Sequence, residues 1–292
     1  MRKAFTLIEL IFVIIIFGIL SSFGAELLYK VYENYVYSNT FNRLQNQSES
    51  AVKQIANRLQ YRIKDSTIAR DNFLSANIEP IGSNSGDENV TEWIGVDIDG
   101  WKGSGAASTS PDWSGFIDLD PTASSASTLS SPGTSASTDT DLAIFFIGSN
   151  IDLNGNSFGW DGNVIGTQTG VSMHRVTLGT NTISSSLSAP HNNFAGVDVY
   201  EYYQLSKSAY AVSLEPDPVG PSNNLWFYYD YQPWEGDDIR TAGTYSKSLI
   251  MENVSSYKFT SMGDILIIQV CVSDGNVTGV GEYAVCKEKV VF

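Results

Sequence analysis

The chain begins with the stretch that decides its fold, Met1-Arg2-Lys3-Ala4-Phe5-Thr6-Leu7-Ile8-Glu9-Leu10, and apolar residues continue to Leu20 with only Gly18 between them. The 21 residues from Phe5 to Ala25 would form a helix of about 30 Å, long enough to cross the core of a bilayer. Basic residues precede this segment, and Glu26 and Glu33 follow it. That distribution of charge predicts a membrane helix with its N-terminus in the cytoplasm and the rest of the chain outside.

A cleavable secretory signal peptide is the alternative interpretation of the same residues. Leu10 to Leu20 would be its apolar region, and the cut would fall at Ala25. Glu9, however, is the one charged residue inside the apolar run. A carboxylate at mid-membrane costs about 2.5 to 3.5 kcal/mol on insertion scales and usually marks a function. Because a cleavable signal gains nothing from that carboxylate, we favour a retained helix.

A family resemblance rests on the same residues. The segment Ala4-Phe5-Thr6-Leu7-Ile8-Glu9-Leu10 resembles the class III signal of type IV pilins and type II secretion pseudopilins, and the likeness ends near Ala25. It implies cleavage between Ala4 and Phe5 by prepilin peptidase, methylation of the new Phe5 amine, and use of Glu9 in filament assembly. The family usually has Gly where this chain has Ala4, and this departure bears on the efficiency of cleavage.

The chemistry of Glu9 is consistent with that role. Cleavage would leave a cationic amine on Phe5, and in apolar surroundings both this amine and the Glu9 carboxylate need a partner. The two groups can neutralise each other between a newly added subunit and its neighbour, which would set the axial register. They can also pair within one helix, since positions 5 and 9 are four apart. Both arrangements stay open.

Helical periodicity continues beyond the membrane segment. Apolar residues recur at a spacing close to 3.6, and no proline occurs before Pro80. We expect one helix from Phe5 to about Asp65, apolar all round in its first half and amphipathic in its second, which docks on a head domain. The predicted organisation is a leader at 1–4, a membrane and stalk helix at 5–66, and an extracytoplasmic head at 67–292.

The head is predicted to be rich in strands, so the expected fold class is α+β, with the long helix packed on an antiparallel sheet in a pilin-like arrangement. β-Branched and aromatic residues alternate there with Gly, Pro and Asn. The expected strands are Val171–Leu178, Val197–Leu205, Ala209–Leu214, Leu225–Tyr231, Ser256–Thr260, Ile265–Val272 and Glu282–Phe292, with weaker candidates at Trp93–Ile98 and Leu142–Ile147. Segment 103–140 is rich in Ser and Thr and has no Lys or Arg, which predicts a long surface loop.

The two cysteines, Cys271 and Cys286, lie on the last two expected strands. In a hairpin centred between Thr278 and Gly279 they stand directly opposite, where Cβ atoms are about 4.5 to 5.5 Å apart and a small closure allows a disulfide. Its loop is worth about 3 kcal/mol in the chain-entropy model. Two buried free thiols are the alternative, but an exported head meets oxidising surroundings. The bridge also resembles the C-terminal disulfide loop of many pilins.

A second resemblance concerns the kind of subunit. Ser248–Phe259 looks like the segment before the last hairpin in J-type pseudopilins and W-type minor pilins. Together with the length of 292 residues, it favours a minor subunit over a major one.

The charge and the residue inventory argue against several functions. With 17 basic and 32 acidic residues the formal charge is −15, which repels nucleic acid, so no nucleic acid partner is expected. The two histidines, His174 and His191, have no nucleophile signature beside them, and His174 lies in a strand pattern that favours a structural role. The turn Asp152-Leu153-Asn154-Gly155-Asn156 departs from a calcium loop at its later positions. We predict no enzyme activity, no cofactor and no metal.

The predicted function is therefore structural, as a minor pilin or pseudopilin of a type IV pilus or a type II secretion filament. The chain would sit once in the inner membrane with its head in the periplasm before it enters the filament. Its partners would be other subunits, prepilin peptidase and inner-membrane lipids. One alternative is a tip-exposed, adhesin-like subunit whose aromatic segments Tyr200–Tyr203 and Trp226–Tyr231 bind a ligand such as a sugar, although packing in a core explains most such runs. Another is a Sec-exported β-rich binding protein.

Overall fold

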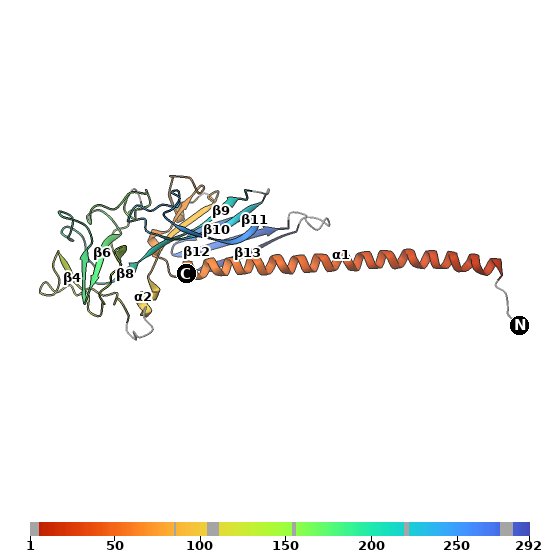
Figure 1. The fold of residues 1–292 in the computed structure, drawn as a ribbon, viewed down its shortest axis with the longest axis horizontal. Helices are drawn as coiled ribbons and strands as arrows, with labels where there is room; N and C mark the ends of the chain where they lie inside the picture. Colours follow the sequence, from red (N-terminus) through yellow and green to blue (C-terminus); the bar gives the residue numbers. More distant parts are fainter. Residues whose placement is uncertain (1–5, 85, 104–110, 154–155, 219–221, 275–282) are drawn as a thin grey trace.

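A long helix projects from a β-rich head in the computed structural model of the chain, which describes residues 6–84, 86–103, 111–153, 156–218, 222–274 and 283–292. The first turn of helix α1 (Leu7–Leu59) is the end of the helix that lies far from the head (Figure 1). The head consists mainly of antiparallel strands. The predicted α+β class, a long N-terminal helix packed on an antiparallel β-head, is thus confirmed.

Helix α1 ends at Leu59, earlier than the predicted end near Asp65. The reason is that the next residues pair with a strand: Ile63 N donates to Ile94 O at 2.8 Å, and Val96 N donates to Tyr61 O at 2.8 Å. Ile63 is buried, but in the core on the far side of the sheet from the helix. A short 3₁₀ turn, η1 (Lys64–Ser66), follows.

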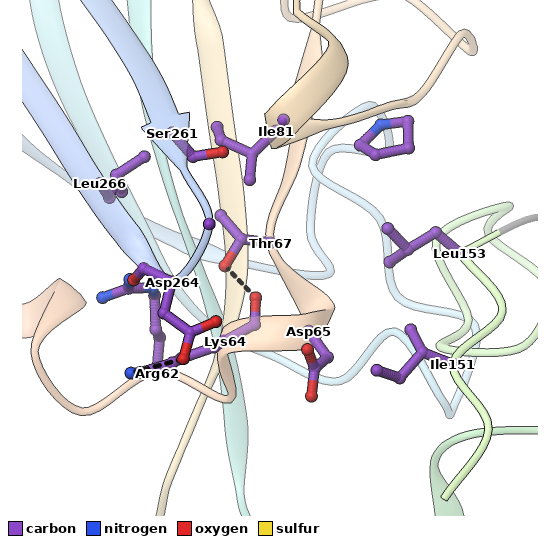
Figure 2. Close-up of a pocket in the computed structure, with 13 residues that line it drawn as sticks. Arg62, Lys64, Asp65, Thr67, Ile81, Ile151, Leu153, Ser261, Asp264 and Leu266 are labelled. Atoms are coloured by element: carbon purple, nitrogen blue, oxygen red, sulfur yellow. Dashed lines mark hydrogen bonds and ion pairs between the residues drawn. The ribbon is translucent and has the colours of Figure 1, made fainter. Parts of the chain in front are cut away.

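The guanidinium of Arg62 connects the C-terminal end of α1 to the head. It donates to Leu59 O and to Asp264 O, both at 2.8 Å. Beside it, Lys64 Nζ lies 3.4 Å from Asp264 Oδ2, and Thr67 Oγ1 donates to Lys64 O at 3.0 Å (Figure 2). The carbonyl left free at the last helical turn is therefore satisfied by a side chain of the following residues.

The second half of α1 docks on the head as predicted. Strands β12 (Ile265–Ser273) and β13 (Ala284–Val291) lie beneath it. Ser48 Oγ donates to Val270 O at 2.9 Å, and the Arg58 guanidinium lies 4.3 Å from the centre of the Phe227 ring. Burying each large aliphatic side chain of this stripe stabilises the contact by about 1.5 to 3 kcal/mol. The buried residues of α1 are Thr40, Leu44, Ser48, Ala51, Val52, Ile55, Ala56 and Leu59.

The main sheet contains eight of the described strands in the order β13-β12-β11-β10-β9-β3-β1-β2, all antiparallel. Its other members are β1 (Ile68–Arg70), β2 (Glu79–Pro80), β3 (Val90–Gly95), β9 (Ser208–Pro216), β10 (Asn223–Tyr231) and β11 (Ser246–Met262). A 3₁₀ turn, η2 (Ile81–Ser83), follows β2. The predicted strand at Ser256–Thr260 is the second half of the longer β11.

A second sheet of five described strands extends the head, where the sequence predicts one sheet. Its order is β4-β7-β6-β5-β8. The chain enters it after Gly95 and leaves it before Ser208, and these two residues are partners in the main sheet. The second sheet is therefore an insertion between the neighbouring strands β3 and β9. Its elements are α2 (Ile98–Lys102), β4 (Thr128–Ser130), β5 (Leu142–Phe146), β6 (His174–Gly179), β7 (Thr182–Ser185) and β8 (Tyr203–Ser206).

Most described residues of segment 103–140 lie outside helices and strands and are exposed or half-buried, but the segment is not a surface loop throughout. Residues 104–110 lie outside the described residues, but β4 belongs to the second sheet and Trp113, Ile117 and Leu129 are buried. The buried hydroxyl of Ser131 is satisfied internally: its Oγ donates to Phe116 O at 2.9 Å and lies 3.0 Å from the Tyr203 hydroxyl. Because these hydroxyls form hydrogen bonds, a polar composition here is compatible with burial.

The aromatic segment Trp226–Tyr231 is covered on both faces within the chain. Phe227 packs in the core beneath α1, whereas Tyr228 and Tyr231 pack in the core between the two sheets. Tyr203 of the other aromatic segment is buried, and Tyr202 is exposed. Core packing thus explains most of these aromatic side chains.

Candidate assembly site

The first half of α1 is an apolar surface with no cover. Every residue from Leu7 to Asn39 is exposed or half-buried, and Leu7 and Phe17 are 78% and 70% exposed. Among the described residues α1 is the one helix long and apolar enough to cross a membrane. A continuous apolar surface of this size marks a contact with lipid or with protein.

Glu9 lies in the first turn of this apolar helix and forms a capping box with Thr6. Glu9 N donates to Thr6 Oγ1 at 3.4 Å, while Thr6 N and Thr6 Oγ1 donate to Glu9 Oε2 at 3.1 and 3.0 Å. The carboxylate also faces the positive end of the helix dipole. The spacing Thr6-Leu7-Ile8-Glu9 is a sequence signature of this motif, so the capping box could be predicted from the sequence.

Of the residues predicted for processing and assembly, Glu9 is described, whereas Ala4 and Phe5 lie outside the described residues. Glu9 follows position 5 by four residues in the sequence. The cleavage at Ala4 and the pairing of the Phe5 amine with Glu9 stay predictions.

Beyond the membrane segment, α1 has one apolar exposed face that points away from the head. Successive residues turn by about 100°, so Leu28 lies about 160° around the axis from Leu44 and about 200° from Ser48, both of which contact the head. Tyr35 has the same angular relation to Ala51. Leu28 and Tyr35 are 69% and 66% exposed. This face is suited to packing against another apolar surface.

The charged side of the same segment lies toward the head. By the same rotation Lys30 falls on the side of Ser48. Lys30 Nζ forms an ion pair with Glu26 Oε1 at 2.8 Å, and both side chains are largely exposed. An exposed pair of this kind contributes little to stability, about 0.3 to 0.5 kcal/mol. The pair lies on the charged side of the stalk helix, opposite to its apolar side.

The predicted disulfide joins the last two strands. Cys271 of β12 and Cys286 of β13 are cross-strand partners, and their Sγ atoms are 2.06 Å apart. Residues 275–282, which contain the predicted turn, lie outside the described residues. Next to the bridged strands, the ring of Tyr283 packs edge-on against Tyr37 of α1 with 5.0 Å between ring centres. The bridge therefore secures the hairpin that supports the middle of α1.

The candidates for other chemistry are not brought together. Among the described residues no three His, Cys, Asp or Glu side chains form a group that could hold a metal. Positions 154 and 155 of the turn that starts at Asp152 lie outside the described residues. His174 is 2% exposed in β6, and burial lowers its pKa to about 4. It is therefore neutral at physiological pH.

Comparison with known proteins gives one finding, at the N-terminus. Residues 1–25 match the family model of the prokaryotic N-terminal methylation motif. No curated protein and no solved structure matches the chain. The matched segment contains the capping box, Glu9 and most of the apolar run that follows.

Proposed function

We propose, from the premise that residues 1–25 mark the chain as a precursor of the type IV pilin and pseudopilin class, that it is a minor structural subunit of a type IV pilus or a type II secretion filament. The observation that carries this proposal is the division of α1. Its first half is apolar and uncovered, and its second half is bound to the chain's own head. A subunit that moves from a membrane into a filament needs this division.

Before assembly, the first half of α1 spans the inner membrane, with the N-terminus in the cytoplasm and the head in the periplasm. Prepilin peptidase cleaves the peptide bond between Ala4 and Phe5 and methylates the new amine. On leaving the lipid, the apolar half of α1 packs against the helices of neighbouring subunits. The outward face with Leu28 and Tyr35 extends this contact beyond the membrane segment.

Glu9 is the residue proposed to direct assembly. Its carboxylate is held by Thr6 at the helix end, so it is in place when a cationic Phe5 amine approaches. A charge in apolar surroundings is stabilised strongly by an opposite charge and costs several kcal/mol without one. The amine belongs either to the same helix or to a neighbouring subunit.

The assignment as a minor subunit is supported by the head. Ser248–Phe259, which resembles J-type and W-type proteins, lies within the central strand β11. The inserted second sheet lies at the end of the head opposite to the free end of α1 (Figure 1). A head enlarged by a second sheet fits most easily at a filament tip, where no further subunit stacks above it. This position also favours the second candidate function, an adhesin-like tip subunit.

Mass analysis of the mature N-terminus tests the processing step. We expect a chain that starts at N-methylated Phe5. A start at Ala25 would refute the pilin assignment and favour a Sec-exported binding protein.

Substitution of Glu9 tests the assembly step. Glu9→Val should insert into the membrane normally but be depleted from sheared filaments. Glu33→Val, which changes a carboxylate farther along the same helix, is the matched control. Equal recovery of the two variants in filaments would exclude the proposed role of Glu9.

A further inference from the structure

We propose that a cavity in the inserted second sheet binds a neutral, hydroxyl-bearing molecule of the size of one sugar unit. The proposal does not depend on the filament role, because no residue of α1 lines this cavity. It assigns a ligand class to a site in the head that neither the N-terminal motif nor Glu9 accounts for.

The cavity has a volume of about 260 Å³. That is below the roughly 300 to 1,000 Å³ of pockets for drug-sized ligands and suits a smaller molecule. Gly170 and Gly196 line it in left-handed conformations, with φ of 76° and 78°, so backbone without side chains forms part of the wall. Its polar lining consists of Ser149, Asn150, Asp152, Ser157, Gln168, His174 and Asp198, so two carboxylates belong to it.

Gln168 supplies a fixed acceptor. Its side chain is 2% exposed, and its Nε2 donates to Arg175 O at 2.7 Å and to Ser185 Oγ at 2.6 Å. These two bonds settle the orientation of the amide. Its Oε1 is buried and has no hydrogen-bond partner among the residues that the structure describes.

His174 supplies a second unpaired polar atom, the ring nitrogen Nδ1. The ring is held between Phe146 and Phe194, with 5.2 and 6.2 Å between ring centres, so packing keeps it from turning toward solvent. Its Nδ1 is buried and also lacks a partner in the described part of the chain. A buried polar group without a partner costs about 1 to 3 kcal/mol, which a bound hydroxyl would recover. Because burial lowers the pKa of His174 to about 4, the ring offers this contact uncharged at neutral pH.

The lining determines the ligand class. None of the described lining residues is Lys or Arg, so an anion would find no counter-charge. Amide, hydroxyl, imidazole and carboxylate groups together offer both donors and acceptors, and a hydroxyl can use both. The cavity near the end of α1 in Figure 2 is different, because Arg62 and Lys64 there already bind protein oxygens.

Saturation-transfer NMR on the full-length protein, in micelles of a phosphocholine detergent without sugar groups, tests the proposal. The probes are methyl glycosides of glucose, galactose, mannose and N-acetylglucosamine, together with the methyl glycoside of glucosamine as the cationic comparison. We expect saturable binding of at least one of them. His174→Phe should weaken that binding about tenfold, since one hydrogen bond to the ligand is lost. It should leave the melting temperature unchanged or higher, because phenylalanine suits the aromatic surroundings.

His191→Phe, at an exposed position outside the cavity, is the matched control and should bind as the natural chain does. Asn150→Ala, at the exposed rim, should also weaken binding and provides the test if His174→Phe does not fold. Three results would overturn the proposal: no binding of any glycoside, equal binding by the natural chain and the cavity variants, or binding of glucosamine without binding of neutral sugars. The last result would assign the cavity to ammonium ligands.

Discussion

Replacing Glu92 by Gln should destabilise the head more than any other single change of similar size. Glu92 of β3 forms an ion pair with Arg70 of β1, and both side chains are 1% exposed. Arg70 also donates from Nη2 to Trp160 O at 2.9 Å, and the Tyr231 hydroxyl donates to the second oxygen of Glu92 at 3.0 Å. The pair thus connects strands β1 and β3 with Trp160 and Tyr231 in the core between the two sheets.

The expected loss follows from the charge that is left behind. Gln keeps the shape of Glu92 and an acceptor for Tyr231, but Arg70 then remains charged and buried without its counter-ion. Breaking a buried pair in this way costs about 3 to 5 kcal/mol. Tyr231→Phe, which removes one hydrogen bond to a carboxylate and keeps both charges, should cost less, about 1.5 to 3 kcal/mol.

The double substitution of Arg70→Met with Glu92→Leu separates charge from packing. It removes both buried charges, so its loss of stability should be smaller than that of Glu92→Gln alone. Urea unfolding of the full-length protein is followed by the fluorescence of buried Trp93, Trp160 and Trp234. It measures the free energy of unfolding of the natural chain, the two single variants and the double variant. A loss below about 1 kcal/mol for Glu92→Gln, or an equal loss for the double variant, would contradict the reasoning.

Three further outcomes are expected. Reducing the Cys271–Cys286 bond should lower the free energy of unfolding by about 3 kcal/mol, measured by urea unfolding with and without reductant, and identical curves would contradict this. Tyr35→Glu on the outward face of α1 should reduce recovery of the protein in sheared filaments, whereas the neighbouring Asn34→Glu on the head side should not. Equal losses for the two variants would contradict a contact that is specific to the outward face. The pKa of His174 is about 4 in the folded protein and 6.5 for the ordinary group, so the unfolded chain takes up a proton at higher pH than the folded chain does. The free energy of unfolding should therefore fall by about 3 kcal/mol in total as the pH drops from about 6.5 to about 4. Unfolding curves at several pH values check this slope, which His174→Phe should flatten.

The N-terminal apolar helix and its methylation motif were predictable because their determinants are adjacent in the sequence. The apolar run, the single Glu9 and the flanking charges lie within a few helical turns, and periodicity reports such local patterns. The cross-strand position of Cys271 and Cys286 was predictable for a similar reason, since the register of a hairpin follows from its centre. The end of α1 was not, because Ile63 continues the apolar spacing of the helix and its partner, Ile94, is distant in sequence.

Composition did not predict which residues of segment 103–140 are buried. A content of Ser and Thr gives the average polarity of a segment, but it does not show whether each hydroxyl finds a partner. The burial of Ser131 depends on Tyr203, which lies on another strand of the second sheet. The cavity beside His174 was not predictable for the same reason, because Gln168 Oε1 and His174 Nδ1 become buried atoms without partners only when loops and strands are assembled around them.

An apolar N-terminal helix with one carboxylate near its start, a β-rich head and a disulfide-bonded terminal hairpin are all features that the amino-acid sequence predicts. Each of these follows from patterns within a short stretch of chain. The insertion of a second sheet between β3 and β9, the pairing of Arg70 with Glu92 in the core, and the apolar outward face of α1 become visible only in the folded protein. Those features depend on contacts between distant residues, whose free energy exists only when the whole head has folded.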